Sequence, residues 1–338
     1  MTTRKGILAG GHFIVDHIKM VDNYPAEDQL AIVRSRTRAG GGGPYNLLCD
    51  LAAMQAEFPL QAVGLLGNDP DGQWMAADCH KHGIDTQFLQ TTSEAATAWT
   101  DVMTVAASGR RTFFHFSGAN AALCDRHFLF DGVEARIFYL GYLSLLDGLD
   151  AMDDQGRTGA ARVFERARSA GLVTVADLVS REHPQLLEIV AAAAPQLDYL
   201  LLNELEAGWL VGRSLAGAQL NARPLHDAAA QILDLGINGA VVIHCEHGAV
   251  CSHRSKGVFE QGVVALPPGY IQSRLGAGDA FAAGFLYGVH QEQDMDKCLL
   301  LAACAAATCL ADATATGGVQ SLEQCLSLAQ THGMRPMP

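Results

Sequence analysis

The chain has 338 residues, of which 49% are hydrophobic and 17% charged, and its formal net charge at pH 7 is −13. This length and composition allow a large buried core and exclude an extensively disordered chain. The acidic balance argues against a nucleic-acid partner, because binding to a phosphate backbone requires a basic stripe that is missing here. No run is long and apolar enough to span a membrane, and the nine cysteines include no C-x-x-C pair. We therefore expect a cytoplasmic protein with reduced thiols and no membrane partner.

Short apolar runs that favour strands alternate along the chain with longer Ala- and Leu-rich stretches that favour helices. The predicted strands are Ile7–Val15, Gln61–Leu66, Ile137–Leu140, Leu172–Ala176, Tyr199–Leu202 and Ala240–His244. The predicted helices are Pro44–Met54, Asp71–Lys81, Gly159–Ala170, Leu186–Ala193, Asn203–Val211, Leu225–Leu235, Ala277–Val289 and Lys297–Leu310. This alternation is typical of an α/β fold built around a mainly parallel sheet.

Two stretches, about 16–38 and 96–116, alternate apolar and polar residues instead, which is typical of antiparallel strands. Thr97–Val105 and Arg111–Phe116 are the clearest of these strands, joined through a Ser-Gly turn. We therefore predict one domain over residues 1–338, with a small β-sheet from these two stretches standing off the main sheet. The tail from Gly333 to Pro338 is predicted to be disordered.

The segment Gly276-Ala277-Gly278-Asp279 opens a predicted helix and is the most informative in the chain. Its glycines allow a tight turn, and the N–H groups of the first helical turn form a site for an anion. The residues alone leave two interpretations of Asp279 open. It caps the helix, or it accepts a proton from a substrate hydroxyl while the amides stabilise a transferring phosphoryl group.

This segment resembles the C-terminal signature of the ribokinase-like (PfkB) carbohydrate kinases, Gly-Ala-Gly-Asp followed by an apolar helix. Further matches follow in the family's order, namely Gly10-Gly11 with Asp16, Gly40–Asn46, Gly67–Gly72, Gly118–Asn120 and Asn203–Glu206. The resemblance implies a ribokinase-like three-layer α/β/α sandwich with a mainly parallel sheet and a small β-sheet lid. It also implies an ATP-dependent phosphotransferase that moves the γ-phosphoryl group to a primary hydroxyl of a sugar or sugar-like substrate.

The resemblance also implies roles for individual residues. Asp279 would be the base, and the anion hole would be Gly276, Ala277 and Gly278. The substrate contacts would be Asp16, Gly42, Gly43, Asn46 and, from the lid, Arg111. The residues on the side of ATP and Mg²⁺ would be Asn203, Glu206 and Gly248, with the first two acting through water. From the residues alone, Asp16 in a turn, Asn46 as a helix cap and Glu206 on a solvated helix face remain open.

Two segments depart from the family's pattern, and both lie on the nucleotide side. Ser273-Arg274-Leu275 stands where the family has Asp-Thr-Thr or a similar triplet before Gly-Ala-Gly-Asp. His244-Cys245-Glu246-His247-Gly248 keeps only the later glycine of a Thr-x-Gly-like turn. The departures therefore bear on nucleotide affinity and ion dependence.

The segment 244–248, with Cys251 and His253, is also the densest cluster of metal-ligand residue types. It lacks a second Cys or His pair at zinc-finger spacing, and strand alternation sends neighbouring side chains to opposite faces, so we expect no structural metal site. The chain has no G-x-x-x-x-G-K-[ST] and no G-x-G-x-x-G after its first strand. These absences argue against a P-loop kinase and against a dinucleotide oxidoreductase.

Two alternatives to a sugar kinase stay open. One is a nucleoside kinase of the same fold, and the other is a catalytically weak sugar-binding protein that has lost residues on the nucleotide side. By the same resemblance, a homodimer formed through the small sheet is expected.

Overall fold

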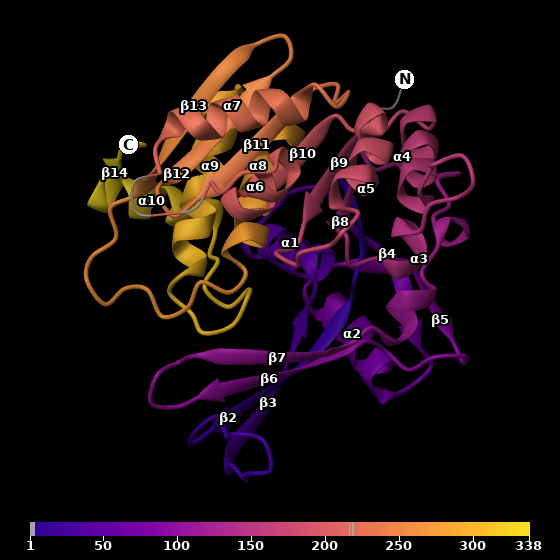
Figure 1. Cartoon of the computed structure of the whole chain (residues 1–338), viewed down its shortest axis with the longest axis vertical. Coiled ribbons are helices and arrows are strands. Elements are labelled where there is room, and N and C mark those ends of the chain that lie inside the picture. The colour runs from indigo at the N-terminus through magenta and orange to yellow at the C-terminus, as the bar shows by residue number, and fades with distance from the viewer. Residues whose placement is uncertain (1–3, 216, 218–219) are drawn as a thin grey trace.

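The computed structural model describes residues 4–215, 217 and 220–338, and a ten-stranded sheet forms its centre (Figure 1). Its strand order is β14-β13-β12-β11-β10-β9-β8-β1-β4-β5. The parallel part contains β1 (Ile7–Gly11), β4 (Leu60–Gly67), β5 (Asp85–Thr92), β8 (Ile137–Leu143), β9 (Val173–Leu178), β10 (Tyr199–Asn203) and β11 (Ala240–Cys245). An antiparallel edge follows, formed by β12 (Gly248–His253), β13 (Gly257–Val264) and β14 (Met334–Arg335).

Helices cover both faces of this sheet (Figure 1). One face carries α4 (Gly159–Ser169), α5 (Leu186–Ala193), α6 (Glu204–Val211) and α7 (Ala222–Leu233). The other carries α1 (Gly43–Ala53), α2 (Pro70–Lys81), α8 (Ala277–His290) and α9 (Met295–Cys309), with α10 (Leu322–His332) beside α9. The predicted three-layer α/β/α sandwich is therefore confirmed. No helix in the described part of the chain is long and apolar enough to cross a membrane.

The central strands are apolar without alternation because both of their faces are buried. On β10, Leu200 and Leu202 belong to the core beneath α4 to α7, whereas Leu201 belongs to the core beneath α1, α2, α8 and α9. On the second of these faces, α8 and α9 approach closely at Gly284, where a Cβ atom would lie 2.5 Å from the carbonyl oxygen of Leu301. Gly284 therefore allows these two helices to pack closely.

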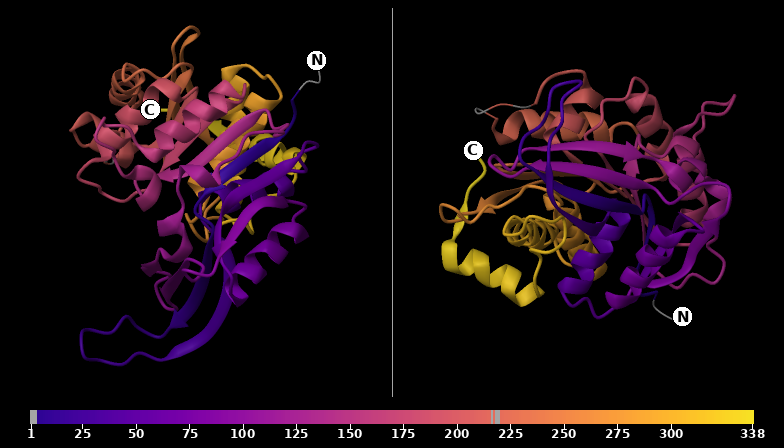
Figure 2. Two further views of the ribbon diagram at one scale, coloured as in Figure 1. Left: turned by 90° about the vertical axis from the view of Figure 1, so that its right-hand side faces the viewer. Right: turned by 90° about the horizontal axis from the view of Figure 1, so that it is seen from below.

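A second, four-stranded sheet projects from the main body and is called the small sheet below (Figure 2). Its order is β3-β2-β6-β7, formed by β2 (Ile14–Val21), β3 (Val33–Gly41), β6 (Trp99–Val105) and β7 (Arg111–Phe116). The strand predicted over Ile7–Val15 is wrong as a single element, because the chain leaves the main sheet after Gly11. The backbone of Gly11 has φ +122°, and a Cβ atom there would lie 2.7 Å from the carbonyl oxygen of Gly141. Such a conformation favours glycine and redirects the chain into the small sheet.

The prediction of a disordered tail is also wrong. Met334 and Arg335 form β14 and pair with Val264 and Val263 of β13. The free edge of β13 offers backbone groups to this segment, which a sequence pattern cannot reveal because the partner lies about 70 residues away.

Candidate active site

The predicted anion hole lies at the start of α8. Gly276 is the N-cap residue, in the left-handed conformation at φ +78°, and no side chain caps the helix. A Cβ atom on Gly276 would lie 2.1 Å from the carbonyl oxygen of Ala315, so only glycine fits this turn. The first N–H groups of a helix have no partner within the helix. Those of Ala277, Gly278 and Asp279 therefore form the positive end of α8.

Asp279 is buried in the first turn of α8, with 7% of its surface exposed. The Nδ2 atom of Asn46 donates to its Oδ2 atom at 2.8 Å. The hydroxyl of Tyr142 donates to both carboxylate oxygens, at 3.1 and 3.2 Å. Burial raises the pKa of Asp279 to about 6, and the hydrogen bonds from Asn46 and Tyr142 act in the opposite direction. Asp279 is thus held in one orientation with a pKa close to neutrality, as a general base requires.

The sequence predicted Asn46 and the glycines before it at the same site, and the structure brings them together around the start of α1. Gly42 is the N-cap of α1 at φ +92°, and a Cβ atom there would lie 2.0 Å from the carbonyl oxygen of His12. Gly43 is buried against the ring of Tyr142. Asn46 follows one turn later, with its Oδ1 atom buried and unpaired among the described residues. That oxygen is free to accept a hydrogen bond from a substrate.

Asp16 lies on β2 beside the same turn. A Cβ atom on Gly41 would lie 2.5 Å from Asp16 Oδ2, so the glycine leaves room for the carboxylate. Burial raises the pKa of Asp16 to about 7, opposed by a hydrogen bond with Thr100. Asp16 is therefore a largely desolvated carboxylate beside the α1 turn, suited to accept hydrogen bonds from sugar hydroxyls.

Asn203 and Glu206 lie at the start of α6 and bind each other. The side chain of Asn203 caps the helix, accepting from the N–H groups of Leu205 and Glu206 at 2.9 and 3.0 Å. Glu206 accepts in return from the Asn203 N–H at 2.9 Å and from the Ser180 hydroxyl at 3.0 Å. Asn203 is thus the cap of α6, and Glu206 is buried and not a solvated helix residue.

The segments that depart from the family pattern meet each other. Arg274 Nη1 donates to Glu246 Oε2 at 2.9 Å, which joins the turn before α8 to the β11–β12 turn. His244 packs on Phe281, with ring centroids 4.9 Å apart, and lies 3.4 Å from the position of a Cβ atom on Gly278. Gly248 lies instead against β13, where a Cβ atom would approach the Gln261 carbonyl oxygen to 2.2 Å, so strand packing explains this glycine.

Sequence reasoning missed two residues of this site, Tyr142 and Asp177. Asp177 is buried at the end of β9, where it accepts from the Tyr142 N–H at 2.8 Å and from the Tyr139 hydroxyl. Burial raises its pKa well above the usual range, with Asp279 adding to the effect. Tyr142 has φ +66°, which is a strained conformation for a tyrosine. This strain is visible in the structure, whereas no sequence motif indicates it.

Arg111 extends from β7 toward the anion hole. Its Nη1 atom donates to Ser273 Oγ at 3.0 Å and its Nη2 atom to the Ala313 carbonyl oxygen at 2.6 Å. In the structure, Arg111 therefore binds the two loops around the start of α8.

The carboxyl groups of Asp177, Glu206 and Asp279 fit a hydrated divalent cation. Burial raises the pKa of Glu206 to about 7, and Asp279 acts in the same direction. Among the ion pairs of the described residues, none includes Asp177, Glu206 or Asp279. The described residues contain no cluster of three or more His, Cys, Asp or Glu side chains that would ligate a metal directly. Mg²⁺, which keeps most of its waters, suits such a set.

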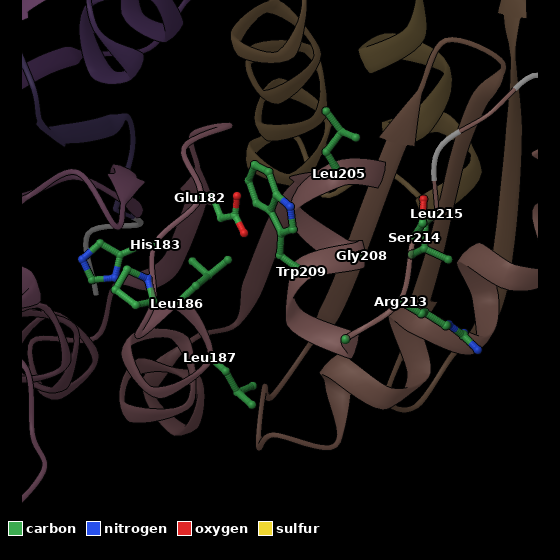
Figure 3. A pocket seen from close by; sticks show the side chains of 12 residues that line it. Glu182, His183, Leu186, Leu187, Leu205, Gly208, Trp209, Arg213, Ser214 and Leu215 are labelled. Atoms are coloured by element: carbon green, nitrogen blue, oxygen red, sulfur yellow. The ribbon is translucent and has the colours of Figure 1, made fainter.

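A separate hollow of about 810 Å³ lies between α5 and α6 (Figure 3). Its lining includes the apolar side chains of Leu186, Leu187, Leu205 and Trp209, together with Glu182. These helices cover the face of the sheet opposite α1 and α8. The hollow is therefore distinct from the group of residues around Asp279.

Comparison with known protein families matches residues 4–321 to "pfkB family carbohydrate kinase". The chain belongs to this family. It is therefore a carbohydrate kinase, as the resemblance in its sequence implied, and it phosphorylates a sugar-like acceptor.

Relatives of this kinase have related activities. It is 26% identical over 312 residues to the ATP-dependent ribose-1-phosphate kinase of Halopiger xanaduensis, covering 89% of this chain and 91% of that protein. It shares its fold with the Arabidopsis thaliana ribokinase complexed with ribose and ATP, at a TM-score of 0.76, 20% identity and coverage of 96% and 98%. The Methanocaldococcus jannaschii nucleoside kinase is similar at a TM-score of 0.72, 17% identity and coverage of 97% and 98%.

Proposed function

We propose that this kinase transfers the γ-phosphoryl group of ATP to a primary hydroxyl of a sugar or sugar-like substrate, with Asp279 as the base. The observation that carries the proposal is the position of Asp279. It is a buried carboxylate in the first turn of α8, fixed by Asn46 and Tyr142, beside an N-terminus that no side chain caps. A proton acceptor and a set of N–H donors that no side chain caps thus lie within one helical turn.

The same geometry gives each group a task. Asp279 removes the proton of the acceptor hydroxyl as that oxygen attacks the phosphorus, and the N–H groups of Gly276, Ala277 and Gly278 stabilise the charge on the transferring group. Asn46 and Tyr142 keep the carboxylate aligned, because both donate to its oxygens. When bound, Mg²⁺ neutralises charge on the phosphates; Asn203 and Glu206 would hold it through water.

The acceptor is proposed to lie between the α1 turn and the small sheet. Asp16 and the free Oδ1 atom of Asn46 would bind its hydroxyls, and Gly42 and Gly43 would shape the α1 turn beside it, because both pack too closely against the protein to carry a Cβ atom. The small sheet would then act as a lid that excludes water, so that ATP is not hydrolysed instead.

A nucleoside acceptor is the second candidate, supported by the fold shared with a nucleoside kinase. A weak binding protein is disfavoured because Asp279 retains the position and hydrogen bonds of a base. The enzyme is inferred to be cytoplasmic, which agrees with nine free cysteines.

The experiment is a thermal-shift panel of sugars and nucleosides with and without Mg·ATP, followed by ³¹P NMR of mixtures that contain the stabilising compounds. Specific ligands raise stability by mass action. We expect a sugar to stabilise the protein and to become phosphorylated at a primary hydroxyl. Phosphorylation of nucleosides alone would favour the second candidate, and sugar binding without transfer would contradict the proposed activity.

We further infer a homodimer formed through the small sheet. Its strands and the β2–β3 connection expose large apolar side chains, with exposed fractions of 83% for Leu30, 49% for Val33 and 48% for Phe114. Apolar patches of this kind mark protein contacts. Sedimentation equilibrium is expected to show a dimer that Phe114→Ser weakens, and a monomer at all concentrations would contradict the inference.

A further inference from the structure

The inner face of β7 spans the proposed active site. Because side chains alternate along a strand, Arg111, Phe113 and His115 point to one face of the small sheet. His115 pairs across the strands with Thr100, and Thr100 pairs with Asp16, so this is the face that carries the proposed sugar ligand. The hydrogen bond between Thr100 Oγ1 and His115 Nδ1, 3.0 Å long, lies on the same face.

At one end of this face, Arg111 binds two loops of the main domain. It donates to the Ser273 hydroxyl at 3.0 Å and to the Ala313 carbonyl oxygen at 2.6 Å. These residues are separated from Arg111 by 162 and 202 positions in the sequence. Both contacts use a charged donor, the stronger class of hydrogen bond. The planar guanidinium holds two acceptors at once, which an ammonium group cannot do with the same geometry.

Both loops shape the anion hole directly. Ser273 Oγ also accepts from the N–H of Leu275 at 3.0 Å, which fixes the backbone immediately before Gly276. The carbonyl oxygen of Ala315 packs against Gly276 so closely that a Cβ atom there would lie 2.1 Å from it. Arg111 therefore contacts both segments that hold the turn at the start of α8.

The other end of β7 reaches the start of α1. The ring of His115 stacks on that of His12, with centroids 6.0 Å apart. The carbonyl oxygen of His12 lies 2.0 Å from the position of a Cβ atom on Gly42, the N-cap of α1. One strand of the small sheet thus connects the turn that leads to Asn46 with the turn that leads to Asp279.

We propose that Arg111 is a latch, a positioning residue that fastens the small sheet to both loops of the anion hole. The start of α8 then has its working geometry only while the sheet is closed, so phosphoryl transfer is coupled to exclusion of water. This inference rests on the proposed function, and it gives Arg111 a different role from the substrate contact expected from the sequence. Within the described residues, no ion pair includes Arg111, so its partners are the loops themselves.

Hydrogen–deuterium exchange of the ligand-free protein tests the latch without any assumption about the substrate. Arg111→Ala is expected to raise exchange several-fold in β7, in 273–276 and in 311–316, because closure that protects these amides is lost. Arg111→Lys is expected to raise exchange in the same segments, since lysine keeps the positive charge but lacks the planar guanidinium that binds two acceptors at once. Arg110→Ala is the control, because Arg110 is the exposed neighbour in the adjoining turn. Unchanged exchange in Arg111→Ala, or wild-type protection in Arg111→Lys, would overturn the latch.

Steady-state kinetics then separate positioning from substrate binding. Arg111→Ala should lower kcat by about 10- to 100-fold while the KM for the acceptor stays within about twofold, because a misplaced anion hole weakens the transition state. ATP hydrolysis per phosphoryl transfer should rise, since water enters an open site. A raised KM with unchanged kcat would overturn the latch in favour of a substrate contact. If wild-type enzyme transfers phosphate to no acceptor, the proposed function fails, whereas the exchange result still decides the latch.

Discussion

Two helices, α6 and α8, begin on the side of the sheet where the parallel strands end, and their N-termini are satisfied differently. The start of α6 is closed by the protein, because Asn203 caps it and Glu206 binds back to Asn203. The start of α8 has a glycine in the left-handed conformation as its cap and no side-chain acceptor. A helix end whose N–H groups are not capped by a side chain is available to a ligand. The difference supports the proposal that α8 receives the transferring phosphate and that α6 supports residues around it.

Among substitutions outside the proposed base, Gly276→Ala should produce the largest change, because it adds a Cβ atom 2.1 Å from the Ala315 carbonyl oxygen at a positive φ. Moving this turn by about 1 Å is expected to lower kcat by roughly 10²-fold. Gly212→Ala is the control, since Gly212 ends α6 at φ +67° with nothing within 4 Å of the added atom. It should cost about 1–2 kcal/mol of stability and leave kcat unchanged. Equal kcat losses in the two variants would contradict a special role for the α8 turn.

Asp16→Ala tests the acceptor side of the site. Loss of a charge-assisted contact to hydroxyls should weaken sugar binding by roughly 1.5–3 kcal/mol and leave ATP affinity almost unchanged. Asp101→Ala is the control, because Asp101 lies on the opposite face of the small sheet, paired with Lys19. If calorimetry showed a fall in ATP affinity instead, Asp16 would lie at the nucleotide site and not at the acceptor site.

Asn203→Ala tests whether Asn203, besides capping α6, contributes to the binding of Mg·ATP. Chemical denaturation should show a loss of about 0.5–2 kcal/mol in the free energy of unfolding. Asn221→Ala should cost a similar amount, because Asn221 caps α7 in the same way. Only Asn203→Ala is expected to raise the KM for Mg·ATP, and an unchanged KM would reduce Asn203 to a structural cap.

Tyr142→Phe should give the smallest effect, a shift of the pH–rate profile. Burial raises the pKa of Asp279 to about 6, so the rate should fall as the pH falls through this value and the base becomes protonated. The hydrogen bond from Tyr142 stabilises the carboxylate and lowers this pKa. Removing the hydroxyl raises the pKa, which moves the acidic limb to higher pH. A limb that stays in place or moves to lower pH would exclude Tyr142 as a determinant of the pKa of the base.

The layered fold could be predicted because each element carries its own local signal. The strand β10 is a continuous apolar run, and α8 follows the Gly-Ala-Gly-Asp turn. The division of Ile7–Val15 between two sheets could not be predicted, because the run is apolar on both sides of the break. What decides the break is the approach of Gly11 to Gly141, a contact between residues distant in the sequence.

The same limit applies to the site. Family resemblance placed Asn46 and Asp279 in one site, and the structure supplies their hydrogen bond across 233 positions. Tyr142 could not be found, because its function depends on a strained backbone at the end of β8 and not on a motif. The departures at 244–248 and 273–275 looked independent in the sequence, yet Arg274 and Glu246 join them. Contacts between distant segments build most of this site, and they leave no periodic pattern in a single sequence.

The central claim is tested most directly by the turnover of Asp279→Asn with a phosphorylated acceptor identified. The substitution keeps the shape of the side chain and removes its capacity to accept a proton, so kcat should fall by at least about 10²-fold while nucleotide binding and melting temperature stay near wild type. Asp294→Asn, at the exposed N-cap of α9, serves as the control and should turn over like wild type. An Asp279→Asn enzyme that retained most of its turnover would contradict the account and reduce Asp279 to a helix cap.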